Sequence, residues 1–262
     1  RLANPNRQPQ NLALPNANLQ YSASRNGFDN FSTQIFKIMG PVNLHRNLVY
    51  SPISLHILLA MMYLGARGNT ALELQRNLYL PAQPLETQWM FSNLIQNLPL
   101  TAETKVSMAN KMYYSSTIQV DPQWNAVTKQ NFDSEIEPLN FKSPLQAVDI
   151  MNSWVAQKTN QKIQNIMNTN SIKEDTKALL VNAIYFKGKW AKEFSTDDTL
   201  PMEFNNMPQG KNTVPTMYLE ETLRYGNIPN LNCQIVELPY LNSNLSMWII
   251  LPNKMRALED LE

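Results

Sequence analysis

The sequence predicts an α+β fold, because helical patterns dominate its first two-thirds and strand patterns dominate the rest. Apolar residues recur every three or four positions in several early segments and at alternate positions in the late ones. Of the 262 residues, 43% are hydrophobic and 16% are charged, which supplies a sizeable core for one large domain or two small ones. Helices followed by strands, rather than alternating with them, are typical of the α+β class.

The N-terminal segment divides into a tail and a helix. Residues 1–20 are rich in Asn, Gln and Pro and lack periodicity, so we expect a disordered or loosely attached tail and a folded domain over 21–262. Phe28 and Phe31 begin an apolar stripe at helical spacing, and Pro41 is expected to end that helix.

A buried helix is predicted directly after a short strand. Asn47–Pro52 has the apolar character of a short buried strand. Ser51 is a good N-cap for the next helix, Pro52 suits its first position and Gly65 suits its end. Residues 53–64 are apolar nearly all round, so we expect this helix to lie inside the protein.

Four more helices are predicted further along the chain. A capping box from Thr70 to Glu73 opens the first of them, and Pro81 closes it. The last is a long amphipathic helix with an apolar stripe that continues to Met167. In chain order, these helices cover about 70–80, 85–98, a short stretch after residue 122, and 145–167.

Two of the predicted strands carry an amide on an apolar face. Residues 106–114 alternate in polarity and include Asn110 on their apolar side. Residues 178–186 are apolar on both faces except for Asn182, which is typical of a central strand covered on both sides. An unpartnered buried amide costs about 1–3 kcal/mol, so Asn182 has partners or the strand is not always closed over it. Further strands are expected near 135–141, 201–204, 214–219, 222–226, 233–239 and 245–251, the last two as a hairpin across an Asn-rich turn.

The chain lacks the groups that most enzymes and metal sites need. It has one cysteine, Cys233, and two histidines, of which His56 fits a packed core position and His45 a polar loop. No nucleotide-binding glycine pattern or nucleophile motif occurs, so the sequence predicts no catalytic residue, metal or cofactor. A formal charge of +1 does not indicate a nucleic-acid-binding protein. No apolar run approaches the ~20 residues that a membrane-spanning helix needs. Two N-x-S acceptor triplets, at Asn30 and Asn244, favour a secreted glycoprotein.

Five long stretches of the sequence resemble the serpin family of protease inhibitors. They are NLVYSPISLHILLAMMYLGARGNTALELQRNLYLP (47–81), MANKMYY (108–114), MNSWVAQKTNQKIQNI (151–166), LLVNAIYFKGKWAKEF (179–194), and VPTMY (214–218) with VELPYLNSNLSMWIILP (236–252). Together they cover nearly the whole chain from Phe28 onward. The resemblance implies the serpin fold, in which a long helix lies across the main sheet.

The resemblance also implies a mechanism and the residues that serve it. A serpin is metastable: a target protease cleaves an exposed reactive loop and becomes acylated, and the loop then inserts as an extra strand into the main sheet. By the resemblance, Ser51, Ser54 and Asn182 match the shutter region, where the sheet parts. Trp190 matches the breach, where insertion begins. From the residues alone, the alternative is that Asn182 bonds a neighbouring backbone group and Ser54 caps its own helix.

The resemblance further implies that the reactive loop is not in these residues. About a third of a typical serpin is expected beyond Glu262, so a C-terminal segment of the same protein is an expected partner. The expected target is a trypsin- or chymotrypsin-like serine protease, with a cysteine protease as a second option, and the expected location is extracellular. The main alternative is a non-inhibitory serpin that acts as a binding, transport or chaperone protein.

Overall fold

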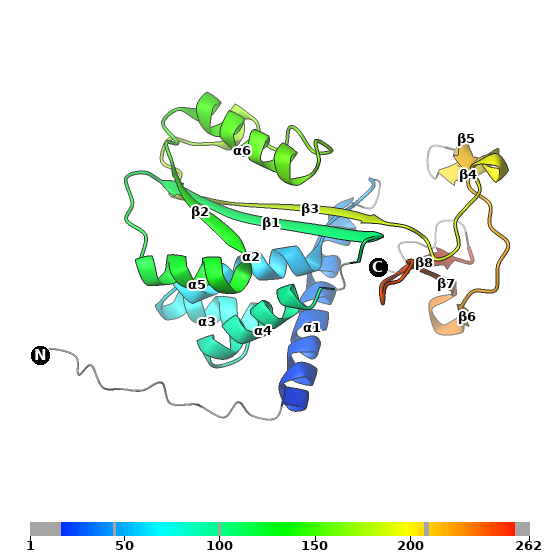
Figure 1. Ribbon diagram of the computed structural model, residues 1–262, viewed down its shortest axis with the longest axis horizontal. Helices are drawn as coiled ribbons and strands as arrows, with labels where there is room; N and C mark the ends of the chain where they lie inside the picture. Colours follow the sequence, from blue (N-terminus) through cyan, green and yellow to red (C-terminus); the bar gives the residue numbers. More distant parts are fainter. Residues whose placement is uncertain (1–16, 44–45, 99–100, 207–209, 255–262) are drawn as a thin grey trace, which may run out of the picture.

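Helices and strands occupy two regions of the molecule, joined by one extended link (Figure 1). The structure is a computed structural model that describes residues 17–43, 46–98, 101–206 and 210–254. A region called the helical body holds α1 to α6 and β1 to β3, and a region called the β lobe holds β4 to β8. The predicted α+β class is confirmed.

The helical body is built on a three-stranded sheet in the order β2-β1-β3. Strand β1 (Thr104–Ser115) pairs in parallel with β2 (Ser134–Leu139) and antiparallel with β3 (Ala178–Gly188). Helix α6 (Pro144–Lys158) covers one face of this sheet, and α2 (Pro52–Gly65) lies against the other (Figure 1). The sheet is therefore the middle of three layers, with an apolar cluster on each side.

The alternation of side chains along each strand explains the two apolar clusters. Successive side chains of a strand point to opposite faces, so odd and even positions of β1 and β3 belong to different cores. Ala109 and Val181 pack with Met151 and Val155 under α6. Met108 and Leu180 pack on the α2 side, in a cluster whose buried members are Phe31, Ile57, Leu58, Ala60, Met61, Tyr63, Leu78, Leu80, Phe91 and Phe132.

The remaining helices surround α2, as the sequence predicted for a helix that is apolar nearly all round. They are α1 (Ala17–Asn43), α3 (Gly68–Asn77), α4 (Pro84–Gln96) and α5 (Pro122–Phe132). The predicted N-cap is confirmed, because the Ser51 hydroxyl accepts a hydrogen bond from the Ser54 backbone N–H at 3.3 Å.

Helix α1 extends beyond both of its predicted limits. It begins at Ala17, inside the predicted tail, whereas residues 1–16 lie outside the described residues. It also continues past Pro41 to Asn43. Pro41 stands in the last turn, where its missing N–H removes a single helical bond, and the Asn43 amide donates to the Met39 carbonyl at 2.8 Å.

Two other helical predictions were wrong at their ends. Helix α3 begins at Gly68, so Thr70 is inside the helix and the predicted capping box does not form. Helix α6 ends at Lys158 instead of 167, because Asn160 and Gln161 adopt positive φ angles of 48° and 61°, which no right-handed helix accommodates.

One strand prediction was also wrong. Asn47–Pro52 is not a strand: Val49 is 94% exposed, and no strand in the described ranges pairs with this segment. Strand β3, whose pattern is typical of a central strand covered on both sides, ends the strand order of its sheet, so its outer edge is unpaired within the described residues. Helices still cover both faces of its first half, which accounts for its apolar sequence.

The β lobe consists of two small antiparallel sheets. Strands β4 (Leu200–Asn206) and β5 (Gly210–Thr216) form one, and β6 (Tyr225–Ile228), β7 (Cys233–Pro239) and β8 (Ser246–Pro252) form the other. The predicted hairpin is confirmed as β7–β8. Cys233 is fully buried, but the apolar residues of β8 are not, with Met247–Leu251 each 41–61% exposed. Short 3₁₀ turns lie at Thr169–Ser171, Thr196–Asp198 and Pro229–Leu231.

Candidate functional site

Within the described ranges, the amide of Asn182 pairs with the amide of Asn110 on the neighbouring strand. The two residues are directly opposite in the β1–β3 ladder, and Asn182 Nδ2 donates to Asn110 Oδ1 at 2.8 Å. Both stand at even positions, on the α2 side of the sheet, and Asn110 is only 3% exposed. The question that Asn182 raised in the sequence is thus answered by a side-chain pair rather than a backbone bond.

The two serines assigned with Asn182 lie at the start of α2, against the same face of the sheet. The Ser51 hydroxyl donates to Ser54 Oγ at 3.0 Å, and Ser54 is completely buried. Within the described residues, this pair and the Asn110–Asn182 pair are not joined by a hydrogen bond. The structure therefore brings the three predicted residues to one layer, as two separate polar pairs.

Trp190 lies where the helical body meets the β lobe. Its backbone bridges to Tyr240, and the two rings stack with centroids 4.6 Å apart and an interplanar angle of 12°. The Ala191 N–H donates to the Pro239 carbonyl at 2.9 Å, and the Leu241 N–H donates to the Lys189 carbonyl at 2.8 Å. These contacts hold the end of β3 against the β7–β8 hairpin.

Tyr240 is the residue of this junction that sequence reasoning missed. A Cβ at Gly188 would come within 2.6 Å of the Tyr240 ring, so any other residue there would force the ring to move. Phe186 packs edge-on against the same ring at 4.9 Å, and burial raises the pKa of the Tyr240 hydroxyl. A signal existed in the sequence, because glycine between Phe186 and Trp190 marks a close approach.

His56 is a packed core residue, as its place on α2 predicted. Its Nε2–H donates to the Leu78 carbonyl at 2.8 Å, and its ring stacks on Phe31 at 4.4 Å and meets Phe91 edge-on at 5.1 Å. Desolvation lowers its pKa from 6.5 to about 4, which outweighs the opposing effect of the bond to Leu78. His45 lies outside the described residues.

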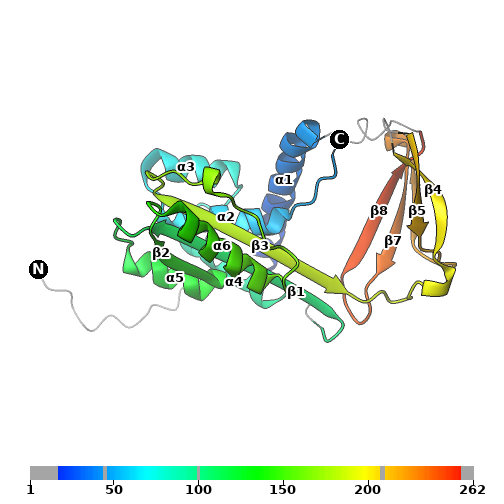
Figure 2. The same cartoon turned by 90° about the horizontal axis from the view of Figure 1, so that it is seen from above.

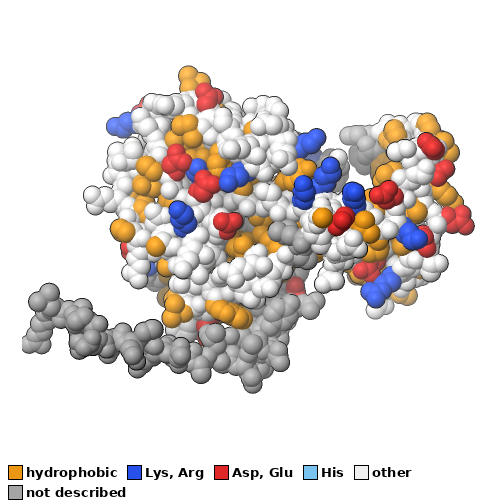
Figure 3. All heavy atoms as spheres, viewed as in Figure 1, with side chains coloured by type: hydrophobic (Ala, Val, Ile, Leu, Met, Phe, Trp, Pro, Cys, Tyr) orange, Lys and Arg blue, Asp and Glu red, His pale blue; other side chains and the backbone are white. Residues whose placement is uncertain are grey.

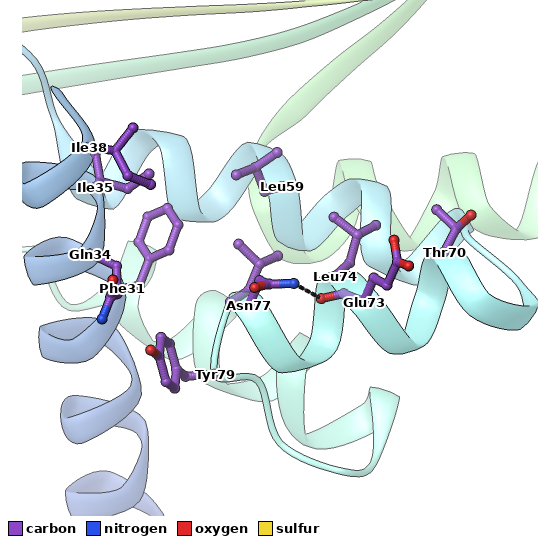
Figure 4. A pocket seen from close by; sticks show the side chains of 11 residues that line it. Phe31, Gln34, Ile35, Ile38, Leu59, Thr70, Glu73, Leu74, Asn77 and Tyr79 are labelled. Atoms are coloured by element: carbon purple, nitrogen blue, oxygen red, sulfur yellow. Dashed lines mark hydrogen bonds between the residues drawn. The ribbon is translucent and has the colours of Figure 1, made fainter. Parts of the chain in front are cut away.

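A pocket of about 570 Å³ lies between α1, α2 and α3 (Figure 4). Its apolar side includes Phe31, Ile35 and Leu59, and its polar side includes Thr70 and Glu73. Its titratable and hydroxyl side chains are Glu73, Thr70 and Tyr79, and no histidine, cysteine or lysine lines it. Among the described residues, no group of three or more His, Cys, Asp or Glu side chains is placed to hold a metal ion.

The acceptor asparagine of each N-x-S triplet is exposed. Asn30 is exposed on α1, and Asn244 is exposed in the turn that joins β7 to β8. Within the described part of the chain, each helix is too short or too polar to cross a bilayer.

Comparison with known proteins places this fold in a family. The family model for the serpins, serine protease inhibitors, matches residues 26–262. A leukocyte elastase inhibitor of Xenopus laevis is 35% identical over 227 residues, which are 86% of this chain and 60% of the relative. Serine protease inhibitor 42Dd of Drosophila melanogaster is 35% identical over 233 residues, which are 88% of this chain and 63% of the relative.

A solved structure gives the same result. A structure of Serpin48, a highly specific serpin of the insect Tenebrio molitor, superposes with a TM-score of 0.86 at 26% identity, covering 92% of this chain and 65% of that one. The chain thus spans less than two-thirds of the length of these relatives. With the family model over most of its length and the same fold, the chain belongs to the serpin family.

Proposed function

We propose that this protein inhibits serine proteases by accepting a cleaved reactive loop as a new strand beside β3. One observation carries the proposal: β3 is an apolar strand with helices over both faces, yet its outer edge is unpaired within the described residues. Unpaired backbone in an apolar sheet is a template for strand addition. The names of two relatives, an elastase inhibitor and a serine protease inhibitor, support the same activity.

The polar pairs fit an acceptor sheet that opens and closes again. We assign Asn182, with Ser51 and Ser54, to the region where the sheet parts, that is, where a strand from polypeptide outside the described residues would separate from β3 to admit the loop. Hydrogen-bonded pairs such as Asn110–Asn182 can exchange partners when a neighbouring strand arrives. Trp190, stacked on Tyr240 beyond the end of β3, is assigned to the end where insertion begins. The reactive loop is proposed to come from polypeptide beyond Glu262, and the target to be a trypsin- or chymotrypsin-like protease.

A protease panel tests this function. The longest product of the gene is incubated with trypsin-like, chymotrypsin-like and cysteine proteases and run on a denaturing gel. A covalent complex that survives denaturation is expected with at least one serine protease, and none is expected from residues 1–262 alone. If the longest product is cleaved without forming a complex, the inhibitory mechanism is wrong and a binding or transport role takes its place.

We further propose that the protein is secreted and glycosylated at Asn30 and Asn244, which are both exposed. The measurement is intact mass of material from a secreting eukaryotic host, before and after enzymatic deglycosylation. Asn30→Gln and Asn244→Gln variants assign any mass shift to a site. An unchanged mass in secreted protein would exclude both sites.

A further inference from the structure

A buried lysine joins two strands and a helix beneath α6. Lys111, on β1, has a side chain only 7% exposed, and its Nζ lies 2.9 Å from Glu135 Oε2 and 2.7 Å from Glu137 Oε2, both on β2. Lys158, in the last turn of α6, places its Nζ 2.9 Å from Glu135 Oε1. These four residues, called the Lys111 cluster, carry two positive and two negative charges. Lysine and acidic side chains lie side by side over this part of the body in Figure 3.

The Lys111 cluster is closed from above by an aromatic side chain of α6. The Trp154 ring centre lies 5.5 Å from Lys111 Nζ and 5.9 Å from Lys158 Nζ, and the Tyr113 ring centre lies 5.0 Å from Lys111 Nζ. Cations gain from the negative face of such rings, and more so away from water. Lys111 is therefore shielded from solvent only while α6 is seated on the sheet.

The lysine and its main partner both remain charged. Burial acts to lower the pKa of Lys111, but hydrogen bonds with Glu135 and Glu137 overcome it and the pKa is raised. Burial acts to raise the pKa of Glu135, but the hydrogen bonds and charges of Lys111 and Lys158 overcome it and lower that pKa to about 2. The contact between α6 and the sheet is thus ionic at its β2 side and apolar at its β3 side.

Helix α6 and the segment after it occupy the face of β3 that an added strand would share. Val181 of β3 is in the apolar cluster under α6, and Ile172 belongs to the same cluster. The Asn152 side chain accepts hydrogen bonds from the backbone N–H groups of Ile166 and Met167, at 3.1 Å each, so the segment returns along α6 on its way to β3 (Figure 2). Alternate side chains of a strand paired with β3 would point to this face, so α6 must yield.

We propose that Lys111 is a positioning residue for strand insertion. The Lys111 cluster fastens α6 to β1 and β2, and the strength of this fastening sets how readily α6 yields when a strand joins β3. Lys111 regains hydration when the helix lifts, and the other three side chains of the cluster are already 39–47% exposed, so the contact can open and form again. The insertion step rests on the proposed function, whereas the fastening does not.

The fastening is tested by hydrogen exchange in the longest product of the gene. Lys111→Gln removes the charge, Lys111→Arg keeps it, and Lys105→Gln removes an exposed lysine from the same strand and face. In Lys111→Gln, amide exchange in α6 is expected to rise at least tenfold, with exchange in α2 unchanged. Lys111→Arg and Lys105→Gln should stay within twofold of the unaltered protein. Unchanged exchange in α6, or an equal rise in α2, would overturn the proposal.

The role in insertion is tested by conversion and association rates. On mild heating below the unfolding temperature, Lys111→Gln should convert to an inserted monomer at least fivefold faster, while its association rate with the target protease stays within twofold. Faster exchange without faster conversion would refute the positioning role. If the unaltered protein neither traps a protease nor converts, the proposed function fails and the insertion role fails with it, and the exchange data alone then decide whether Lys111 fastens α6.

Discussion

Asn110 and Asn182 form one pair, so replacing either residue acts on both. Asn182→Leu leaves the buried Asn110 amide without its partner, which is expected to lower the free energy of unfolding by about 1–3 kcal/mol. Changing both residues to Leu removes the unsatisfied group, so the double variant should lose less than the sum of the two single variants. Urea denaturation measures all three, with Asn125→Leu on the exposed side of α5 as the control. Strictly additive losses would mean that the two amides do not depend on each other.

His56 makes the stability of the protein depend on pH. Its pKa is about 4 in the folded protein and about 6.5 unfolded, so the unfolded chain takes up a proton first as the pH falls. Its contribution is therefore present above pH 6.5, declines between pH 6.5 and 4, and amounts to about 3 kcal/mol in total. In His56→Gln, the slope of unfolding free energy against pH over this range should fall by the amount that corresponds to the uptake of one proton on unfolding. An unchanged slope would show that His56 is not held neutral.

Glu135 acts in a lower pH range, which overlaps that of His56 only between about pH 4 and 4.5. Its pKa is lowered to about 2, so its contribution is present above about pH 4.5 and declines as the pH falls toward 2. Glu135→Gln should therefore flatten the pH dependence of unfolding only below pH 4.5 and leave it unaltered between pH 4.5 and 6.5. Chemical denaturation at intervals of half a pH unit distinguishes the two residues. A change confined to the range above pH 4.5 would contradict the assigned pKa.

At the scale of elements, two side chains hold the segment between α6 and β3: Thr159 bonds the Ile163 backbone at its start, and Asn152 bonds the backbone at 166 and 167. Asn152 accepts hydrogen bonds from two backbone N–H groups and donates to the Met167 carbonyl at 3.0 Å. Asn152→Ala should loosen this segment and speed trypsin cleavage after the exposed Lys162 several-fold. Limited proteolysis measures the rate, with Asp149→Ala, an exposed change on the same helix, as the control. Equal rates in both variants would show that the segment is held by other contacts.

Local patterns predicted elements but not their partners. Helix α2 and strands β1 and β3 were predicted because the spacing of their apolar residues, and the capping residues of α2, lie within each segment itself. The failure at Asn47–Pro52 has the opposite cause: strand character needs a paired neighbour, and none of the described strands supplies one. The Lys111 cluster was missed for a similar reason, because a lysine on an apolar strand is explained only by glutamates more than twenty residues away. Asn182 was noticed because an amide among apolar residues is conspicuous within its own segment.

At the scale of the whole molecule, the β lobe buries few of its apolar side chains. Met247–Leu251 of β8 are each 41–61% exposed, and the outer edge of β8 is unpaired within the described residues. Surfaces of this kind associate with apolar probes and with one another. Residues 1–262 on their own are therefore expected to bind an apolar dye and to self-associate. Ile250→Lys should reduce both, whereas Leu72→Lys, an exposed change on α3, should not. A monomer that binds no dye would contradict the exposed face.

The position of Cys233 allows the opening of the β lobe to be followed separately from the helical body. It is the single thiol in the sequence and is fully buried at the start of β7, so a thiol reagent reaches it only when the β lobe opens. The helical body contains no thiol and contributes nothing to the signal. The rate of chemical labelling at Cys233 therefore reports how often the β lobe opens, in this sequence and without an introduced reporter.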